Sequence, residues 1–439
     1  MNKLLRSVLA IFTFGALAAC GGGGGSDSLP PVPTVGCSTT TAGDLTVTFA
    51  GTIPTGKTGA VKVYDASGTL AGTATATSPT LSGLAAGAYV LVSTPLSGAA
   101  NAIVRQAYDA AVSPDQVCIG DGTTETSTAT YALIPTSNKL WVGSQGSGIN
   151  NTVSYAATSL TATATVAATT VNTTKGHSGF AIDTHGNLWV LGQSTTDPLL
   201  ARYPAGSFSA GGAKTPDFTV PLSAIPYAAP HSKGLAISPR GHIWVSSPGN
   251  DEVYRFKAAP GGVVETTPSV TITGLNYPTG LAFDASGTLW VSDTGSGHLL
   301  RYSVFPVTDG AILSTPSVDT NPGQDVTGIA FDAAGNLWVA SLVQGQLIRV
   351  GSAALYGGGN VTPDKWFAAG SLPVSVAIDE NGLVWVGGNA GSIRAFNPGA
   401  ANGTAAIRTI TTNTSEMNYG ESLAFYPAPA ALPLAHSLP

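Results

Sequence analysis

Four aspartates of this 439-residue sequence stand at one fixed place, each three residues before a glycine. Carboxylates at matched positions could bind a metal ion. An Asp-x-x-Gly segment is also typical of a turn, in which the carboxylate accepts hydrogen bonds from turn amides and the glycine takes a left-handed conformation. The constant offset from the glycine favours turn capping over metal binding. The four residues are Asp183, Asp284, Asp332 and Asp379.

These turns lie inside a longer repeated unit, whose clearest copy spans residues 280–292 and has the sequence GLAFDASGTLWVS. The tryptophans that mark successive copies are 48, 55, 46, 48 and 47 residues apart. A period near 48 with about four short strands per unit is typical of propeller blades. We expect the tryptophans to pack as wedges between neighbouring blades. They are Trp141, Trp189, Trp244, Trp290, Trp338 and Trp385.

The repeats predict an all-β protein with a six-bladed propeller over residues 125–429, or seven blades if the two degenerate ends form separate blades. Residues Glu421–Tyr426 repeat only the first strand of the unit. We expect this strand to close the ring on the first blade, beside or instead of Tyr131–Ile134. Residues 430–439 are predicted to be a C-terminal tail.

Basic side chains also recur, and we expect them on the surface. His185 and His242 fall in the predicted turns and are expected to be exposed. An arginine on the third strand of most units has an apolar or aromatic neighbour, which indicates a solvated outer-face position. The arginines are Arg202, Arg255, Arg301, Arg349 and Arg394.

The first nineteen residues have the features of a signal peptide. Val8–Ala19 is an apolar run too short to span a bilayer comfortably, and it follows a basic start. The segment ending in Cys20 resembles the bacterial lipobox, which implies that Cys20 becomes the first mature residue and carries lipid. Gly21 stands where lipoproteins of the inner membrane carry aspartate, so the resemblance implies an outer-membrane lipoprotein facing the periplasm or the exterior. Residues 20–36 are predicted to be a Gly- and Pro-rich tether.

Residues 37–120 are predicted to form a small β-sandwich that acts as a spacer. Val61–Tyr64 alternates in polarity as a half-buried strand does. Cys37 and Cys118 are the only cysteines besides Cys20. In an exported protein, an isolated pair predicts a disulfide. The segment VYDASG and the later pattern L-x-x-G-x-Y-x-L resemble transthyretin-like or carboxypeptidase-regulatory sandwiches, which implies a spacer or a binding platform.

The charge pattern argues against nucleic-acid partners. Charged residues make up 10% of the chain, the formal net charge is −6, and no run or stripe of basic residues occurs. The chain also has no P-loop, nucleophile elbow, HExxH segment or dinucleotide fingerprint.

The unit GLAFDxxGxLWVxD resembles NHL repeats and the repeats of virginiamycin B lyases, with gluconolactonase-type propellers as more distant relatives. The resemblance covers about 300 residues and implies fold more than chemistry. In these folds the loops before the first strand and after the second strand open on one face, around a funnel. The candidate funnel-face residues at those positions are His177, His231, Lys233, Tyr277, Asp293, Asp325, Tyr419 and Glu421.

Two functions follow from these residues. The favoured one is a binding or scaffold module, anchored to the membrane by lipid, whose funnel face takes a protein, peptide or glycan, with no cofactor. The alternative is a periplasmic lyase or lactonase in which a histidine with Asp325 or Glu421 acts as base and acid or binds a divalent cation. The lyase pattern pairs a histidine before the first strand with a glutamate after the tryptophan strand. His231 meets the first requirement, but Ser246 and Ser247 occupy the second position, which disfavours the enzyme.

Overall fold

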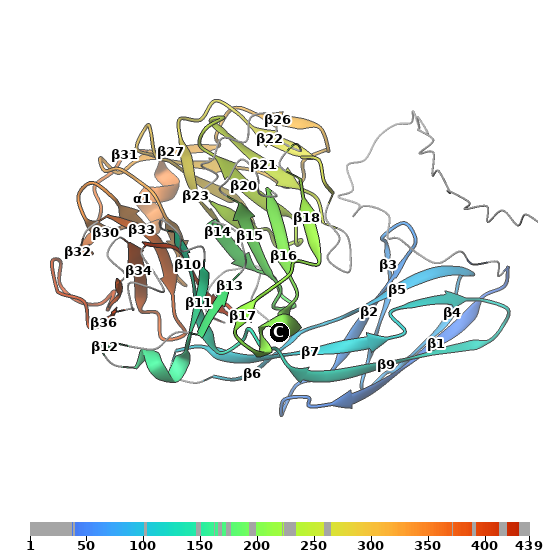
Figure 1. Cartoon of the computed structure of the whole chain (residues 1–439). Helices are drawn as coiled ribbons and strands as arrows, with labels where there is room; N and C mark the ends of the chain where they lie inside the picture. The colour runs from blue at the N-terminus through green and yellow to red at the C-terminus, as the bar shows by residue number, and fades with distance from the viewer. Residues whose placement is uncertain are drawn as a thin grey trace, which may run out of the picture.

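A computed structural model gives the fold of this chain (Figure 1). It describes residues 37, 40–100, 103–145, 151–161, 163–165, 169–172, 177–192, 199–221, 223, 234–258, 265–370, 372–388, 392–411 and 419–429. The predicted signal peptide, Cys20, the tether and the tail at 430–439 lie outside these residues. None of the described helices is long and apolar enough to cross a membrane.

Two sheets form an N-terminal sandwich around a shared core. Residues from both sheets, among them Val47, Val63, Leu91 and Tyr131, pack into one apolar cluster. The predicted disulfide between Cys37 and Cys118 is confirmed. In order across the sheets, the strands are β4 (Thr80–Leu84), β1 (Gly43–Gly51), β9 (Thr124–Leu133), β7 (Arg105–Ser113) and β6 (Leu96–Ala100) in one, and β3 (Leu70–Thr75), β2 (Ala60–Asp65), β5 (Gly87–Ser93) and β8 (Gln116–Ile119) in the other.

The predicted boundary between the two domains was too early. Strand β9 pairs in parallel with β1 and antiparallel with β7, so residues 124–133 belong to the sandwich and not to the propeller. The hydroxyl of Tyr131 reinforces this placement by donating to the sandwich carbonyls of Ala60 and Thr94. Both domains are built from strands with alternating polarity, so local pattern could not assign this strand to either.

Six further sheets make the propeller, which we number as blades 1 to 6. Each blade has four antiparallel strands running from the central channel outward. From the channel outward, blade 1 has β37 (Tyr419–Tyr426), β10 (Lys139–Gln145), β11 (Asn151–Ala156) and β13 (Thr169–Asn172), and blade 2 has β14 (His177–Ile182), β15 (Leu188–Gly192), β16 (Leu200–Tyr203) and β18 (Phe218–Val220). Blade 3 has β19 (Leu235–Ile237), β20 (Ile243–Ser247), β21 (Glu252–Phe256) and β22 (Val270–Ile272), and blade 4 has β23 (Pro278–Phe283), β24 (Leu289–Asp293), β25 (His298–Tyr302) and β27 (Val318–Asn321). Blade 5 has β28 (Ile329–Phe331), β29 (Leu337–Ser341), β30 (Gln346–Val350) and β32 (Lys365–Ala368), and blade 6 has β33 (Pro373–Ile378), β34 (Val384–Gly388), β35 (Ser392–Phe396) and β36 (Arg408–Thr411).

Short added strands extend four of these blades at the outer edge. Each comes from the following blade in the ring and pairs in parallel with the outermost strand. Pairing covers backbone groups that an exposed sheet edge would leave open. These strands are β17 (Gly212–Ala213), β12 (Ala164–Thr165), β26 (Ala311–Leu313) and β31 (Gly359–Asn360), and the short helical segments are η1 (Ala157–Leu160), η2 (Ala205–Ser209) and α1 (Ser352–Gly357).

The ring closes as the sequence predicts. Strand β37, from the C-terminal end of the described chain, pairs along its length with β10 and supplies the innermost strand of blade 1. Leu140 of β10 lies opposite Phe425 of β37. The described residues therefore form six blades, and the seven-blade alternative has no strands left to build it.

The marker tryptophans are wedges between blades, as expected. Each is at most 1% exposed. Trp290 of blade 4, for example, packs in one cluster with Leu337, Val339 and Ile348 of blade 5. Trp385 of blade 6 packs against blade 1 in the same way, which continues the core around the ring.

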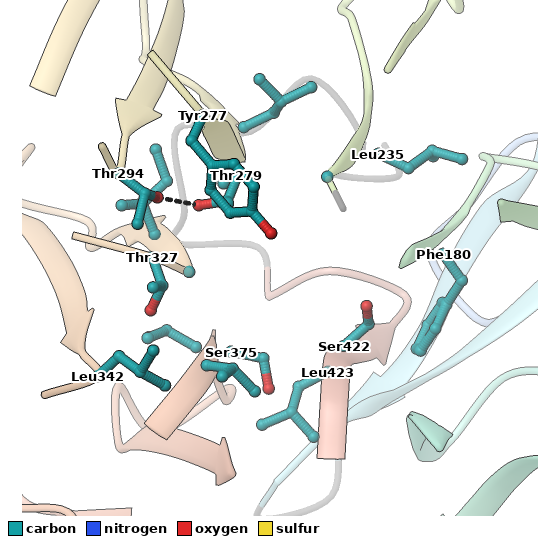
Figure 2. A pocket seen from close by; sticks show the side chains of 17 residues that line it. Phe180, Leu235, Tyr277, Thr279, Thr294, Thr327, Leu342, Ser375, Ser422 and Leu423 are labelled. Carbon is teal, nitrogen blue, oxygen red and sulfur yellow. Dashed lines mark hydrogen bonds between the residues drawn. The ribbon is translucent and has the colours of Figure 1, made fainter. Parts of the chain in front are cut away.

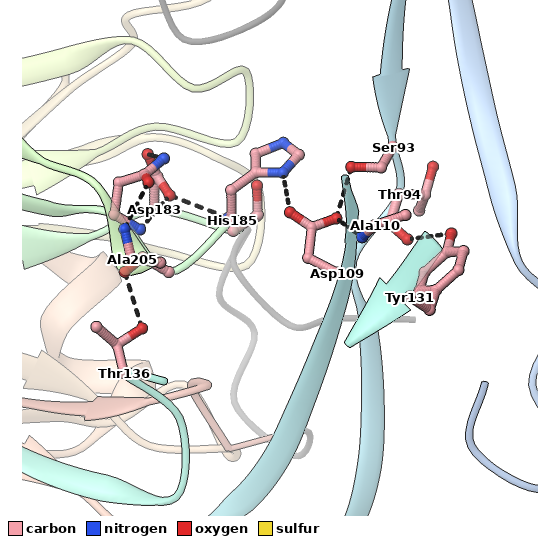
Figure 3. Close-up of polar contacts among 12 residues, drawn as sticks. Ser93, Thr94, Asp109, Ala110, Tyr131, Thr136, Asp183, His185 and Ala205 are labelled. Atoms are coloured by element: carbon pink, nitrogen blue, oxygen red, sulfur yellow. Dashed lines mark hydrogen bonds and ion pairs between the residues drawn. The ribbon is translucent and has the colours of Figure 1, made fainter. Parts of the chain in front are cut away.

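The sandwich docks on one face of the propeller. Arg105 of β7 forms an ion pair with Glu380 in the turn between β33 and β34, at 2.6 Å. Asp109 of β7 meets His185 in the turn between β14 and β15, with 2.7 Å between Oδ2 and Nδ1 (Figure 3). Ile103 packs into the core shared by blades 1 and 6. Since these contacts fall on the Asp-x-x-Gly turns, the opposite ends of the innermost strands face away from the sandwich.

Candidate functional site

The central channel is narrowed by a ring of six apolar side chains, one from the innermost strand of each blade. The ring lies between two cavities, because its members line both of them. The cavity at the start of the innermost strands has a volume of about 240 Å³, and the one at their ends has a volume of about 190 Å³. We call the first cavity the funnel mouth; it opens on the face away from the sandwich. The ring comprises Phe180, Leu235, Leu281, Ile329, Val376 and Leu423.

Above this ring, the funnel mouth is bordered by hydroxyl groups (Figure 2). None of the described residues that line it carries a charge. An apolar floor with a few placed polar groups is the usual composition of a small-molecule site. The hydroxyls belong to Tyr277, Thr279, Thr294, Thr327, Ser375 and Ser422.

The threonine hydroxyls present mainly acceptors to the cavity. Thr294 Oγ1 donates to the Val326 carbonyl at 2.6 Å, and Thr327 Oγ1 donates to the Ala340 carbonyl at 2.8 Å. With the Thr294 proton committed, the 2.6 Å contact between Thr279 and Thr294 must use the proton of Thr279. These three threonine oxygens therefore offer only lone pairs to a ligand, so this part of the border favours ligand groups that donate hydrogen bonds.

Tyr277 is the most exposed of the large residues at the mouth, with 40% of its surface accessible. Its backbone has φ of +55°, a left-handed conformation that is uncommon for a bulky residue. Such conformations persist only where the surroundings fix them, and they cluster at functional sites. Here two carboxylates do so: Asp251 Oδ1 accepts from the amide of Tyr277 at 2.8 Å, and Asp293 Oδ1 accepts from the amide of Asn276 at 2.6 Å.

Asp293 therefore holds the loop that carries Tyr277 in place and does not itself line the mouth. Its side chain is buried, and Oδ2 also accepts from Ser296 Oγ at 2.5 Å. Burial raises the pKa of Asp293 above its usual value, although the hydrogen bonds from Ser296 and Asn276 oppose this shift. A carboxylate with this many committed contacts is a poor candidate for a metal ligand or a general base.

Asp325 has the same kind of role on the next blade. Its two oxygens accept from Ser341 Oγ at 2.8 Å and from the amide of Val343 at 2.9 Å. These contacts brace the loop after β29, which places Leu342 at the funnel mouth. Two acids predicted to lie on the funnel face, of which Asp325 was also a candidate acid of the alternative function, thus hold the loops that carry Tyr277 and Leu342.

The remaining sequence candidates are described only in part. His177 begins β14 and pairs with Gly192, while Tyr419 and Glu421 lie in β37, so their backbones stand near the mouth. Their side chains, and the whole of His231 and Lys233, lie outside the described residues. Among the residues that are described, no group of three His, Cys, Asp or Glu side chains could hold a metal ion. The described mouth thus supplies no ligand set for the divalent cation of the alternative function.

The four turn aspartates cap their turns, as predicted. In blade 4, Asp284 Oδ1 accepts from the amides of Ser286 and Thr288 at 2.9 and 3.0 Å. A second role was not predicted: Oδ2 accepts from the indole of the marker tryptophan, at 3.1 Å for Trp290. The same indole contact recurs at 2.9–3.1 Å in blades 2, 5 and 6, where the acceptors are Asp183, Asp332 and Asp379.

The prediction of solvated arginines on the third strands is wrong for Arg255 and holds only in part for the others, which are half-buried. Arg202 and Arg349 bind Asp217 and Asp364 through two hydrogen bonds each, at 2.9–3.0 Å. Arg255 is only 2% exposed. The acids that pair with Arg202 and Arg349 lie fifteen residues later along the chain, so no local pattern indicates them.

The prediction of exposed turn histidines is wrong for His242 and holds only in part for His185. His242 is 3% exposed, and its Nδ1 accepts from the amide of Ala258 at 3.1 Å. His185 is partly covered by the sandwich, where it bonds to Asp109, and 31% of its side chain is accessible. Burial opposes protonation of His185, but the hydrogen bond and charge of Asp109, together with the charge of Asp183, raise its pKa. Turn position predicts exposure only when no other element covers the turn.

Comparison with known proteins supports part of the resemblance. A family model for the NHL repeat matches residues 275–302, which span β23 to β25 of blade 4. No curated protein matches the chain. Solved structures that resemble it include the virginiamycin B lyase of Staphylococcus aureus, at 15% identity and TM-score 0.39 over 55% of this chain and 72% of that one.

Two other similar structures carry different descriptions. A functionally unknown protein from Desulfotomaculum acetoxidans has 14% identity and TM-score 0.44, covering 63% of this chain and 100% of that one. A putative 6-phosphogluconolactonase from Bacteroides fragilis has 13% identity and TM-score 0.43, covering 65% of this chain and 97% of that one. Identities this low carry no information about activity, so the site itself must indicate the function.

Sequence reasoning missed most of the funnel mouth. Thr294, Thr327, Ser375 and Leu342 line the mouth, and none of them was a candidate. The sequence candidates were mostly ionisable, because such groups support catalysis, whereas the described side chains that line the mouth carry no charge. A signal was present: residues just before the first strand and just after the second strand are small or hydroxylated in several repeats.

Proposed function

We propose that this chain is a lipid-anchored binding module whose funnel mouth takes a neutral ligand with an apolar body and hydrogen-bond donors. The observation that carries the proposal is the lining of the mouth: three threonine hydroxyls that offer acceptors stand above a ring of apolar side chains, with no charged residue among the described ones. Neutral segments of a peptide or glycan have such donors. Asp293 and Asp325 support this reading because their oxygens are committed to the loops.

A probe experiment tests the site without a known ligand. N-phenyl-1-naphthylamine is neutral and largely apolar, carries one N–H donor, and becomes fluorescent when it leaves water. We expect saturable binding of one probe per full-length chain in a mild detergent below its critical micelle concentration. Absence of saturable binding would count against a preformed apolar site.

Two arginine substitutions in one loop form a matched pair. Leu342 lines the mouth, whereas the neighbouring Val343 is 78% exposed and does not. Leu342→Arg should weaken probe binding about tenfold or more, because desolvating an unpaired charge is costly. Val343→Arg should leave binding unchanged. Equal effects of the two substitutions would show that the probe binds elsewhere.

The anchor is part of the proposal and has its own test. Cys20, a flexible tether and a spacer sandwich would hold the propeller at an outer membrane, with the funnel mouth on the propeller face opposite the sandwich. Radioactive palmitate supplied to cells expressing the chain should label the wild type and not Cys20→Ala. Labelling of the variant, or recovery of the wild type only in soluble fractions, would refute lipidation at this residue.

A further inference from the structure

Blade 3 departs from the other blades at its turn, where Ser238 replaces the aspartate. Ser238 Oγ accepts from the amide of His242 at 3.1 Å, as Asp284 Oδ1 accepts from the amide of Thr288 in blade 4. Serine has a single side-chain oxygen. It therefore reproduces the contact made by Oδ1 of the aspartate but cannot supply the second oxygen that receives the indole.

The indole of Trp244 consequently has no acceptor. Trp244 is 1% exposed, and its Nε1 is without a hydrogen-bond partner among the described residues. In the other blades this nitrogen is paired, with a turn aspartate in four of them and with the Thr136 carbonyl in blade 1. A buried donor that lacks an acceptor is unfavourable, so an acceptor supplied from outside would be stabilised there.

A cavity adjoins this indole. It has a volume of about 130 Å³ and lies between the turns of blades 3 and 4. The centroid of the Phe305 ring lies 3.4 Å from the Arg240 guanidinium carbon. The polar residues that line the cavity are Ser238, Arg240, His242, Trp244, Arg255 and Ser286. In blade 4, Arg301 stands opposite Trp290 in the sheet, and its Nε donates to Asp284 at 3.2 Å. Arg255 holds the same position opposite Trp244 in blade 3.

The charge around the cavity favours an anion. The guanidinium groups of Arg240 and Arg255 line it, and no Asp or Glu is among the described residues that do. Asp309, which pairs with Arg255 and Lys257, lies outside this lining. The neighbouring cations also act on His242. Burial, together with the charges of Arg255, Lys257 and Arg240, lowers the pKa of His242 to about 4, so its imidazole is neutral at pH 7.

We propose that this cavity binds a small carboxylate, whose oxygens accept from Trp244 Nε1 and from the guanidinium groups of Arg255 and Arg240. The ligand would supply the carboxylate that an aspartate supplies within the chain in four other blades. A small carboxylate matches both the guanidinium lining and the small volume of the cavity. This site is separate from the funnel mouth and does not depend on the function proposed for it.

The indole protons report binding directly. The full-length chain, labelled with ¹⁵N in tryptophan, gives one indole signal for each of its seven tryptophans, and Trp244→Phe identifies the signal of Trp244. We expect titration with sodium formate or acetate at pH 7 and constant ionic strength to shift this signal saturably. The signal of Trp290, whose indole already donates to Asp284, is the internal control and should not move.

Two substitutions complete the test. Ser238→Asp restores the turn residue of four other blades, so it should shift the Trp244 signal without ligand and abolish the response to formate. Arg240→Gln changes an exposed residue and should weaken binding about fivefold, the effect of losing one exposed charge pair. No saturable shift, an unchanged response in Ser238→Asp, or saturation by chloride but not formate would overturn the proposal. If the Trp244 signal shifted only with a peptide that has an aspartate between uncharged residues, and not with formate or acetate, a small free carboxylate would be excluded as the ligand.

Discussion

Replacing Asp284 by asparagine should destabilise the propeller strongly. Asp284 is buried, and its Oδ2 accepts from Trp290 Nε1, Arg301 Nε and the Tyr356 hydroxyl at 3.1–3.2 Å. An asparagine oxygen can still serve the turn amides, but its NH₂ group then faces the indole and the guanidinium. The indole and the guanidinium lose their acceptor, whereas the Tyr356 hydroxyl can turn and accept from the new NH₂ group. Hydrogen bonds to charged groups contribute about 1.5–3 kcal/mol each, so we expect a loss of about 3–5 kcal/mol.

Asp332→Asn is the matched control in blade 5. Asp332 caps the same turn, and its Oδ2 accepts from Trp338 Nε1 and Asn336 Nδ2, but Arg349 pairs with Asp364 instead and the carboxylate is only partly buried. We expect a smaller loss of about 1–2 kcal/mol, since no charged donor loses its acceptor. Urea unfolding at pH 7, followed by tryptophan fluorescence and far-ultraviolet circular dichroism, measures both.

The pH dependence gives a second check on the same reasoning. Burial tends to raise the pKa of Asp284, but the hydrogen bonds from Ser286, Thr288, Trp290 and Arg301 lower it overall. A lowered folded-state pKa contributes stability that is present above the unfolded value near 3.9 and is lost as pH falls through the folded value. The difference between wild type and Asp284→Asn should therefore shrink in acid. A difference below about 1 kcal/mol at pH 7, or one independent of pH, would refute the proposed role of the carboxylate.

Three further predictions concern the frame that holds the site. Removing the disulfide with Cys37→Ser and Cys118→Ser should cost the sandwich about 4–5 kcal/mol in urea unfolding, because the bond closes a loop with a separation of 81 residues; an unchanged midpoint would contradict this. His185→Gln should remove a pH-dependent part of stability: the raised pKa of His185 gives a contribution that is complete below the unfolded value of about 6.5 and is lost as pH rises through the folded value. If the difference between the urea midpoints of wild type and variant stays constant from pH 5.5 to 8.5, the ion pair with Asp109 does not stabilise the interface. Deleting residues 419–439 should expose the edge of β10 and cause aggregation in size-exclusion chromatography, whereas deleting 430–439 should not, since every pairing of β37 with β10 falls within 419–426.

The repeat made the propeller predictable, because each copy carries its own structural signals. The Asp-x-x-Gly turn, the marker tryptophan and the apolar first strand all act within a dozen residues, and the structure reproduces them. Strand β9 escaped prediction because its partners β1 and β7 lie outside any local window. The domain boundary depends on this long-range pairing, not on the alternation of the strand itself.

The site was less predictable because sequence position fixes the strand end but not the direction of a side chain. Asp293 and Asp325 stand at the mouth by position, yet both turn into the loops and leave the surface of the cavity to hydroxyl and apolar groups. Which way such a carboxylate turns depends on nearby unpaired amides, such as those of Asn276 and Val343. Those amides are created by the loop conformation, which the sequence pattern does not reveal.

Symmetry offers a way to recognise unusual sites in such a protein, because each blade is a control for the others. Blades 2, 4, 5 and 6 pair the indole with a turn aspartate, so the same turn in blade 3 can be compared with them directly. There the indole of Trp244 has no partner among the described residues, and Ser238 in place of the aspartate accounts for this. An aspartate would supply the missing acceptor within the chain, which would favour stability. With serine at this position, the acceptor can come from a ligand, and the neighbouring Arg240 and Arg255 are suited to a carboxylate.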